Sequence, residues 1–267
     1  MFDINNFEKK IRILKSQIKK KNPVFFISTN LFNLGLSSED FDFVSKYVTS
    51  ELSKIKNSTI IVPTATLNIL NTNVVFDKNK TKSSRMGFFS EFIRKKKNSI
   101  RSNHPLWSFS SRGYYSRNII NNVPKNCYGY DSIFHRLLNY NTYYISFGDI
   151  QNTLSPIHFV EQMIGVPYRF FKEFKIKIKN NKNINNETYL FYAMLPSSKI
   201  IKDNNKKIFK ILTNRKVFQI LKTNNFNIYQ ANYNFLIKNL VSIVNKNPKI
   251  YLKNDKIKFF NNLVYKS

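Results

Sequence analysis

Short runs of apolar residues alternate with longer amphipathic segments along the first 165 residues of the chain. Three of the runs are typical of buried strands: PVFFIST (23–29), STIIVPT (58–64) and TYYISFGD (142–149). Apolar positions at helical spacing predict helices over 3–21, 86–96, 131–141 and from 155 onward. Another helix is expected to begin at Ser38, a good N-cap residue, with Asp42 in its first turn. This alternation of strands and helices predicts an α/β protein.

The remaining part of the chain carries two further patterns. The segments FKEFKIKIKN and ETYLFYAML alternate in polarity around an Asn-rich turn, which predicts a hairpin-like insertion over 174–194. Residues 206–252 are predicted to be mostly helical. Since no internal repeat interrupts the pattern, we expect one domain over 1–267.

Composition excludes several classes of protein. Apolar residues make up 42% of the 267 residues, enough to bury a core and to exclude global disorder. The single cysteine, Cys127, excludes an internal disulfide and a Cys-rich zinc site, and with only three histidines we expect no metal site. No segment offers the about 20 apolar residues of a membrane span or the apolar core of a signal peptide. We therefore expect a cytoplasmic protein without a membrane span.

The charge is extreme, because 44 basic and 15 acidic residues give a net charge of +29. Such a chain either has a polyanionic partner, for example nucleic acid, an anionic membrane surface or a phosphorylated ligand, or reflects a composition rich in Lys and Asn. Basic residues are spread along the chain, with only modest runs at 19–21 and 94–97. This spread weakens the nucleic-acid alternative, which predicts basic residues clustered on one face.

A candidate base lies where a predicted strand passes into a helix. The strand ends at Gly148, the polar turn DIQNT follows, and a helix begins near Ser155. His158 then falls in the first helical turn, where the helix dipole disfavours imidazolium and keeps the ring able to accept a proton. Glu161 lies on the same helix face. The alternative is a histidine that only stabilises the turn, next to a solvated glutamate.

Two other stretches are candidate binding segments. The polar loop RSNHPLWSFSSRG (101–113) contains His104, and its alternative is a structural loop in which His104 bonds to the backbone. The segment FFISTNLFNLGL joins a strand to a helix through Ser28 and Thr29, where free backbone N–H groups can receive a pyrophosphate or a carbonyl. His135 is interpreted as a surface or packing residue.

Taken together, these stretches resemble one known family. IIVPTATLN, MGFFSEFIRKKKNSIRSNHPLWSFSSRG, CYGYDSIFHRLL and SFGDIQNTLSPIHFVEQMIGVPYR occur in the order and spacing of the aminoglycoside 3-N-acetyltransferase (antibiotic N-acetyltransferase) family. The resemblance covers about residues 8–252. It implies a single α/β fold with a central mixed sheet flanked by helices, distinct from the GNAT acetyltransferases. It also implies transfer of acetyl from acetyl-CoA to an amine of an amino sugar.

The resemblance also implies roles for individual residues. His158 matches the general base of the motif N-T-x-x-H-x-x-E, and Glu161 matches the nearby acid. The predicted CoA contacts are Ser28, Thr29, Arg101, Ser102, His104 and Ser108. For the developing oxyanion we expect donors from Thr153 and the backbone after Asn152, and for the acceptor we expect contacts from Asn152, Glu91 and Asp149. No catalytic pattern surrounds Cys127, so we expect direct transfer without an acyl-enzyme.

The chain departs from the family in ways that bear on the acceptor. Ile27 replaces the histidine that opens the family's first motif, and Asp203 is a weak counterpart of a late acidic residue. A chain of charge +29 would repel polycationic aminoglycosides. We therefore expect a phosphate-bearing acceptor, such as a nucleotide- or lipid-linked amino sugar for a surface polysaccharide. True aminoglycoside acetylation, a basic nucleic-acid-binding protein and an inactive scaffold are the alternatives.

Overall fold

The computed structural model describes residues 2–31, 36–181, 183–196, 202–203, 205–253 and 264–265. The strands are β1 (Val24–Asn30), β2 (Thr59–Pro63), β3 (Ile100–Arg101), β4 (Phe109–Gly113), β5 (Thr142–Gly148), β6 (Arg169–Asn180), β7 (Asn183–Met194), β8 (Gln219–Lys222), β9 (Asn227–Asn232) and β10 (Val264–Tyr265). The helices are α1 (Ile4–Ser16), α2 (Ser38–Ser53), α3 (Phe88–Lys95), α4 (Ser116–Ile120), α5 (Ile133–Arg136), α6 (Ile150–Thr153), α7 (Pro156–Ile164), α8 (Lys206–Asn214) and α9 (Tyr233–Lys246). Single 3₁₀ turns lie at Leu67–Ile69 and Leu137–Asn139.

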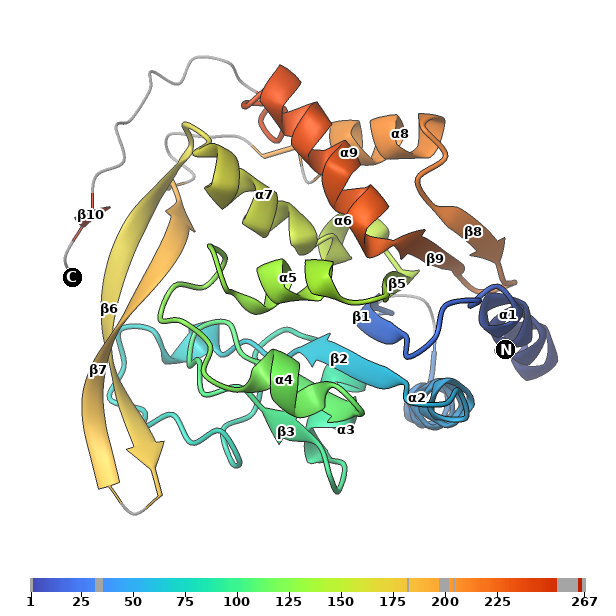
Figure 1. The fold of residues 1–267 in the computed structure, drawn as a ribbon, viewed down its shortest axis with the longest axis horizontal. Coiled ribbons are helices and arrows are strands. Elements are labelled where there is room, and N and C mark those ends of the chain that lie inside the picture. The colour runs from blue at the N-terminus through green and yellow to red at the C-terminus, as the bar shows by residue number, and fades with distance from the viewer. Residues whose placement is uncertain are drawn as a thin grey trace.

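A mixed sheet of seven strands forms the centre of the molecule, in the order β3-β4-β2-β1-β5-β9-β8 (Figure 1). β1 pairs in parallel with β2 on one side and β5 on the other, whereas the outer pairings are antiparallel. The chain thus crosses from one side of β1 to the other, and in such sheets ligands collect at the carboxyl end of the strands beside this switch point. The single α/β domain with a mixed sheet confirms the expected fold class.

The residues of β1 alternate between two hydrophobic cores, as the period of a strand requires. Val24 and Phe26 belong to the larger core, which includes residues of α4, α5, α7, α8 and α9. Phe25 and Ile27 belong to the second core, which α1, α2 and α3 cover. All four side chains are fully buried, which explains why this part of β1 is a continuous apolar run in the sequence.

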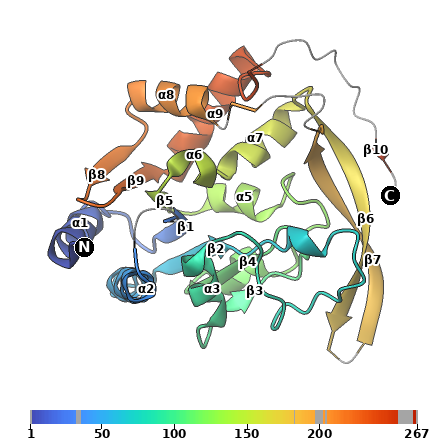
Figure 2. The ribbon, with the colours of Figure 1, turned by 180° about the vertical axis from the view of Figure 1, so that it is seen from behind.

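A long ribbon of two strands, β6 and β7, runs along one side of the molecule, and Figure 2 shows it from behind. The strands pair antiparallel from Arg169–Met194 to Asn180–Asn183, and β10 adds to β6. Phe174, Ile176 and Ile178 are buried against the larger core. The predicted hairpin is present, although its first strand begins five residues before the predicted insertion, at Arg169.

The prediction of a mostly helical segment over 206–252 was wrong in its middle. After α8 ends at Asn214, β8 and β9 form the edge of the central sheet, and β9 pairs with β5. The sequence of β9 is NIYQAN, and its Asn and Gln residues are uncommon in strands, so the local sequence does not predict one. Pairing with neighbouring strands determines its structure instead.

Helix starts also differ in detail from the sequence pattern. Ser37, not Ser38, caps α2: its hydroxyl accepts from the Asp40 N–H, and the Asp40 carboxylate accepts from the Ser37 N–H. This reciprocal pair is a capping box. Asp42 forms an ion pair with Lys46 instead of serving the first turn. Across the described ranges, no helix combines the length and apolar character needed to cross a membrane.

Candidate active site

A cavity of about 160 Å³ lies at the carboxyl ends of β1 and β2, where the sheet topology predicts a ligand site. Its wall is formed by Ser28, Thr29, Pro63, Arg85, Met86, Trp107, Gln151, Asn152, Thr153, Leu154, Ser155, His158, Asn205 and Tyr251. Of the residues predicted from the sequence, this cavity brings together Ser28, Thr29, Asn152, Thr153 and His158. Residues more than a hundred positions apart thus meet at one point.

The chain reaches the cavity from β5 through a tight turn at Gly148. Gly148 has φ +82°, and a Cβ there would lie 2.1 Å from the Asn30 carbonyl oxygen, so a larger residue would clash with the end of β1. Asp149 then caps the short helix α6 by accepting from the Gln151 N–H at 3.0 Å. The predicted polar turn is therefore a helical turn. Ser155 occupies the N-cap position of α7, but its side chain makes no capping bond.

His158 is the centre of a compact polar cluster beneath the cavity wall. Its Nδ1 lies 3.1 Å from Oε2 of Glu161, and the same carboxylate oxygen lies 2.7 Å from the Arg169 guanidinium. The Tyr168 hydroxyl donates to Glu161 Oε1 at 2.7 Å. The Glu161 side chain is 0% exposed and that of His158 22% exposed. The carboxylate is thus fully buried and paired, while the imidazole reaches the cavity.

Two charged groups, the Glu161 carboxylate and the Arg169 guanidinium, face the Nδ1 atom of the imidazole. The Arg169 guanidinium lies 2.9 Å from Nδ1, pairs with the Glu161 carboxylate and donates to the Tyr192 carbonyl, while its Nε has no hydrogen-bond partner among the described residues. When Arg169 donates to Nδ1, the ring proton is on Nε2; when the proton is on Nδ1, the ring donates to Glu161, and Nε2, which has no hydrogen-bond partner among the described residues, is unprotonated. In the latter form the ring can accept a proton at Nε2.

The charges in the cluster set its protonation. Burial, followed by the Arg169 charge, lowers the pKa of His158 below its ordinary value of 6.5, although Glu161 opposes this shift. Burial alone would raise the pKa of Glu161, but the Arg169 charge and the hydrogen bond with His158 lower it. At neutral pH the cluster therefore holds a neutral imidazole above a carboxylate–guanidinium pair.

Aromatic rings hold the imidazole in place. The Trp107 ring meets His158 edge-on at 5.6 Å between centroids, and the Tyr128 ring lies at 5.3 Å. Trp107 is the only tryptophan of the chain, in the loop that the sequence singled out. The packing restricts rotation of the imidazole, which keeps its proton acceptor at one place.

An apolar groove of about 780 Å³ adjoins the cavity. Its wall is formed by Thr29, Asn30, Leu31, Phe41, Ser45, Arg85, Gly87, Phe88, Phe89, Asn152 and Thr153. The groove and the cavity share Thr29, Arg85, Asn152 and Thr153. Two ligands could therefore meet at this shared wall, one in each space.

The loop 101–113 lies beneath the site instead of lining it. Arg101 donates to the carbonyls of Thr64 and Thr81 and to the Ser108 hydroxyl, and it is 7% exposed. Ser108 donates to the Thr64 carbonyl, and Ser102 accepts from the Phe109 N–H. Except for Trp107, none of the loop's side chains is in either cavity wall. This geometry favours a scaffolding role over the predicted contacts with CoA.

His104 bonds to the backbone of its own loop and of a neighbouring segment, which is the structural role that the sequence left open as an alternative. Its Nδ1 accepts from the Trp107 N–H at 3.1 Å, and Nε2 lies 3.3 Å from the Lys125 carbonyl. Burial lowers the pKa of His104 to about 4, so the ring is neutral. Cys127 is buried beside it, and burial raises the pKa of the thiol. His104 thus positions Trp107, which in turn packs on His158.

Four predicted residues remain, and only Asn152 and Thr153 among them line the cavity and the groove, whereas Glu91 and Asp149 do not. Asn152 is on the shared wall, and its amide donates to the Asp149 carboxylate at 2.5 Å. The Thr153 hydroxyl lies 2.6 Å from Ser146 Oγ and 3.2 Å from the Asp149 carbonyl, so protein groups already engage it. Glu91 pairs with Arg94 and accepts from the Ser83 N–H, which lowers its pKa to about 2 despite burial. Glu91 and Asp149 are in neither wall.

The cavity carries positive charge and no carboxylate. Among the described residues that line either space, Arg85 is the one ionised side chain at neutral pH, and none is Asp or Glu. The charge of Lys202 also acts on His158 and lowers its pKa. No group of three or more His, Cys, Asp or Glu residues in the described ranges could hold a metal ion. The wall therefore attracts anions and repels cations.

Comparison with known proteins agrees with this fold. The family model of aminoglycoside 3-N-acetyltransferase matches residues 46–229. The fold is similar to that of aminoglycoside acetyltransferase AAC(3)-Xa (TM-score 0.75, 14% identity, covering 92% of this chain and 94% of that one). It is also similar to AAC-IIIb in a binary complex with CoASH (TM-score 0.74, 12% identity, 89% and 95% covered). The YokD protein of Bacillus subtilis follows (TM-score 0.72, 16% identity, 90% and 99% covered).

No curated protein sequence matches the chain significantly. The fold and the family model nevertheless define an acyltransferase of α/β architecture that is not of the GNAT type. The chain belongs to the aminoglycoside 3-N-acetyltransferase family.

Sequence reasoning missed several residues of the site. Tyr168 and Arg169 stand in the quoted run GVPYR, yet their contacts with Glu161 arise only because the chain reverses at Gly165. Arg85, Gln151 and Tyr251 line the cavity without any distinctive local pattern. The G-V-P-Y-R motif was the one available signal.

Proposed function

We propose that the chain transfers an acetyl group from acetyl-CoA directly to the amine of a phosphate-bearing amino sugar, with His158 as the general base. The observation that carries this proposal is the neutral His158 imidazole, held through Nδ1 by a buried carboxylate and open at Nε2 in the cavity wall. A nucleotide- or lipid-linked sugar for a surface polysaccharide is the expected acceptor.

In the proposed reaction His158 first accepts one proton and later donates it. The sugar amine attacks the thioester carbonyl carbon, and His158 Nε2 takes the proton that the nitrogen loses. The C–S bond then breaks, and the imidazolium returns the proton to the departing CoA sulfur. Glu161 stabilises the transient imidazolium, and Arg169 keeps Glu161 ionised throughout.

The two adjoining spaces suit two substrates. The apolar groove offers Phe41, Phe88 and Phe89 to an aliphatic arm, as the pantetheine part of CoA requires. The acceptor then occupies the smaller cavity, so that thioester and amine meet at the wall shared by Thr29, Asn152 and Thr153. Backbone N–H groups of α6 and the side chains of Thr29 and Asn152 are the candidate oxyanion donors.

The charge of the walls supports an acceptor with phosphate. A polycationic acceptor requires carboxylates, which are absent from the described residues lining the two spaces, whereas Arg85 matches a phosphate. Lys202 adds a second positive charge close to His158. The net charge of +29 acts in the same direction.

The second candidate is acetylation of an aminoglycoside, which the family description and the similarity to AAC(3)-Xa favour. A thiol-release assay with acetyl-CoA separates the two when it compares aminoglycosides with nucleotide-linked amino sugars. We expect faster turnover with the nucleotide-linked panel. Much faster acetylation of aminoglycosides would overturn the proposed acceptor and leave the base intact.

The same assay tests the base with a matched control. Removing a general base costs about 10² to 10⁴ in rate, so His158→Ala should lose at least a hundredfold in kcat. His135→Ala is the control, because His135 occupies the same third position of a helix, α5, but lies outside both cavity walls. Equal activity of the His158 variant and the wild type would exclude the base.

A further inference from the structure

The cavity beside His158 contains buried polar atoms that no described residue satisfies. Among them are the indole Nε1 of Trp107 and the side-chain oxygen Oδ1 of Asn205, which have no hydrogen-bond partner in the described ranges. Trp107 is 9% exposed and Asn205 is 7% exposed. Since buried polar groups are nearly always bonded, two such atoms in one cavity wall indicate a ligand that bonds to them.

Asn205 offers the cavity an uncharged hydrogen-bond acceptor. Its Nδ2 donates to the Gln151 carbonyl oxygen at 2.8 Å, so the amide is oriented and Oδ1 is the atom left without a partner. A carboxylate in this place would favour an ammonium ion and raise the pKa of a bound amine. The carboxamide oxygen can accept from an N–H group and leave the amine free to lose its proton.

Trp107 offers the opposite group, a donor that cannot accept. Its ring packs edge-on against Tyr128 and His158, with 5.2 Å and 5.6 Å between centroids. His104 accepts from its backbone N–H. An oxygen that accepts from the indole N–H must therefore lie close to the group that the His158 imidazole serves.

The size and charge of the cavity restrict the ligand further. A cavity of about 150 Å³ can hold one benzene ring, and this cavity has a volume of about 160 Å³, which suits a single six-membered ring. Its wall contains no Asp or Glu among the described residues. A second ammonium group on the ring would therefore lose water without gaining a counter-charge.

We infer that Trp107 and Asn205 select an acceptor ring that carries one amine next to a hydroxyl group. Asn205 Oδ1 accepts from the amine N–H that His158 does not take, and Trp107 Nε1–H donates to the oxygen of the neighbouring hydroxyl. The two hydrogen bonds orient the amine before it attacks the thioester. This inference rests on the proposed function, which places the acceptor in this cavity, and it defines the ring, whereas the proposed function concerns its phosphate.

The first test follows the indole N–H itself. Trp107 is the only tryptophan of the chain, so the protein has a single indole N–H resonance. We record it in the isotope-labelled protein with CoA present, while either the vicinal trans-aminocyclohexanol or cyclohexylamine is added. These ring amines differ only in the hydroxyl group. The amino alcohol should move the indole proton downfield, as a new hydrogen bond does, and cyclohexylamine should move it much less. Equal movement with both amines, or none with either, overturns the inference.

A second test compares the turnover of the same two amines with acetyl-CoA. The contribution of one hydrogen bond corresponds to a ratio of about two- to tenfold in kcat/KM, so the wild type should favour the amino alcohol by this amount. Trp107→Phe keeps a ring against His158 but has no N–H, and should reduce the ratio to about one. If this variant lowers kcat/KM for both amines equally and keeps the ratio, Trp107 only packs against the base and the inference fails.

Asn205→Asp tests why the acceptor atom is uncharged. Asp fits the same space and tolerates the backbone φ of +62° as Asn does. Its carboxylate should raise activity on diaminocyclohexane relative to the amino alcohol, by about tenfold for one new ion pair in a buried wall. Asn234→Asp is the matched control, because its amide also donates to a backbone carbonyl, that of Leu138, but lies in neither wall. An unchanged ratio in Asn205→Asp would contradict the role of Asn205.

Failure of this inference can be told from failure of the proposed function. The resonance test requires no turnover. An unmoved indole signal in a protein that releases CoA with nucleotide-linked amino sugars rejects the inference alone. A shifted indole signal without thiol release from any acceptor supports the binding site and rejects the proposed acetyl transfer.

Discussion

At the scale of the residue, function depends on how burial and charge act on His158. The ring is held between Trp107 and Tyr128 and contacts Glu161 through Nδ1, so its orientation is restricted. Such restraint costs stability, because Glu161 and Arg169 are both buried ions that must pair. The cluster therefore lowers the stability of the fold while it holds the proton acceptor in one place.

The first prediction concerns the titration of His158. Burial and the Arg169 charge disfavour imidazolium, so the ring should stay neutral as the pH falls through 6.5 and gain its proton only below that value. NMR of the imidazole Cε1–H resonance, assigned with His158→Gln, measures this directly. The acid limb of kcat should coincide with it. A midpoint above 6.5 would show that Glu161 outweighs Arg169.

The second prediction concerns the buried ion pair. Arg169→Met leaves the Glu161 carboxylate buried without its cation, which should cost about 3–5 kcal/mol in urea-induced unfolding. Glu161→Met/Arg169→Met removes both charges and should recover most of that loss. Arg12→Met, which breaks an exposed pair with Glu8, is the control and should change little. Equal losses for Arg169→Met and Arg12→Met would contradict the role of burial.

Part of this site was predictable from residue types and spacing. His158 and Glu161 are three residues apart on one helix, so local geometry brings them together in any fold that keeps α7. Arg101 and Ser108 were predicted to contact CoA, yet hydrogen bonds to the chain occupy them. A polar residue in a motif looks the same in sequence whether it serves a ligand or the backbone, and only burial separates the two roles.

At the scale of the element, strongly apolar strands were predictable and polar ones were not. β1, β2 and β5 are continuous apolar runs because helices cover both faces of the sheet. β8 and β9 contain Gln, Lys and Asn, and they become strands by pairing at the edge of the sheet. Their structure depends on contacts with β5, which no local window contains.

The third prediction tests where α2 begins. Ser37→Ala removes the hydroxyl that accepts from Asp40 N–H and should cost about 1 kcal/mol in the free energy of unfolding. Ser38→Ala is the matched control, since Ser38 is equally exposed, lies one residue further and is already helical. Chemical denaturation of both variants measures the difference. A larger loss for Ser38→Ala would restore the cap predicted from the sequence.

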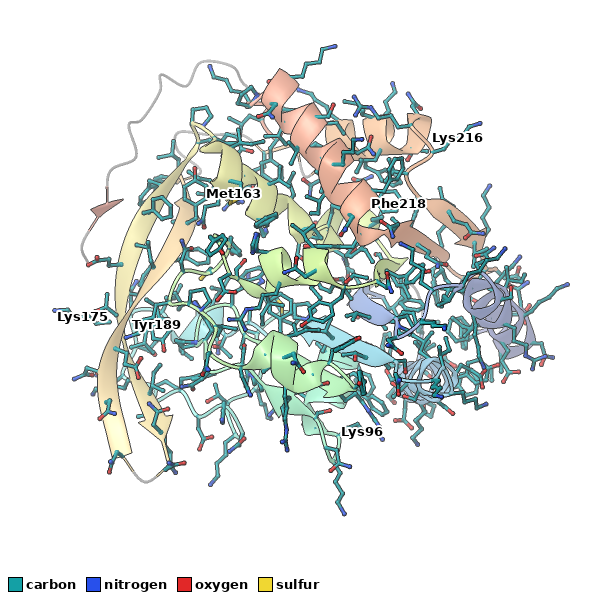
Figure 3. All side chains as sticks on the ribbon, in the orientation of Figure 1. Lys96, Met163, Lys175, Tyr189, Lys216 and Phe218 are labelled. Atoms are coloured by element: carbon teal, nitrogen blue, oxygen red, sulfur yellow. The ribbon has the colours of Figure 1, made fainter. Side chains whose placement is uncertain are left out.

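At the scale of the whole molecule, the charge of +29 is distributed over the surface. Lys96, Lys175 and Lys216 lie on three different sides of the molecule (Figure 3). A single nucleic-acid-binding face would gather them on one side. The distribution therefore supports a general electrostatic background over one dedicated binding face.

The fourth prediction follows from this background. Like charges repel in the folded protein, and salt screens them over a Debye length that falls from about 30 Å at 0.01 M to about 8 Å at 0.15 M. The melting temperature should therefore rise as sodium chloride is added over this range. Differential scanning calorimetry measures it. A melting temperature that falls with salt would mean that favourable ion pairs dominate instead.

The wall shared by the cavity and the apolar groove has a kinetic consequence. Of the residues that the structure describes, only Thr29, Arg85, Asn152 and Thr153 belong to both spaces, so a molecule in one leaves most of the other open. On the proposed function, neither substrate then has to wait for the other, and both must be present before acetyl moves. Initial-rate plots at several fixed acceptor concentrations should give intersecting lines, the signature of a ternary complex, and not the parallel lines of an acyl-enzyme mechanism.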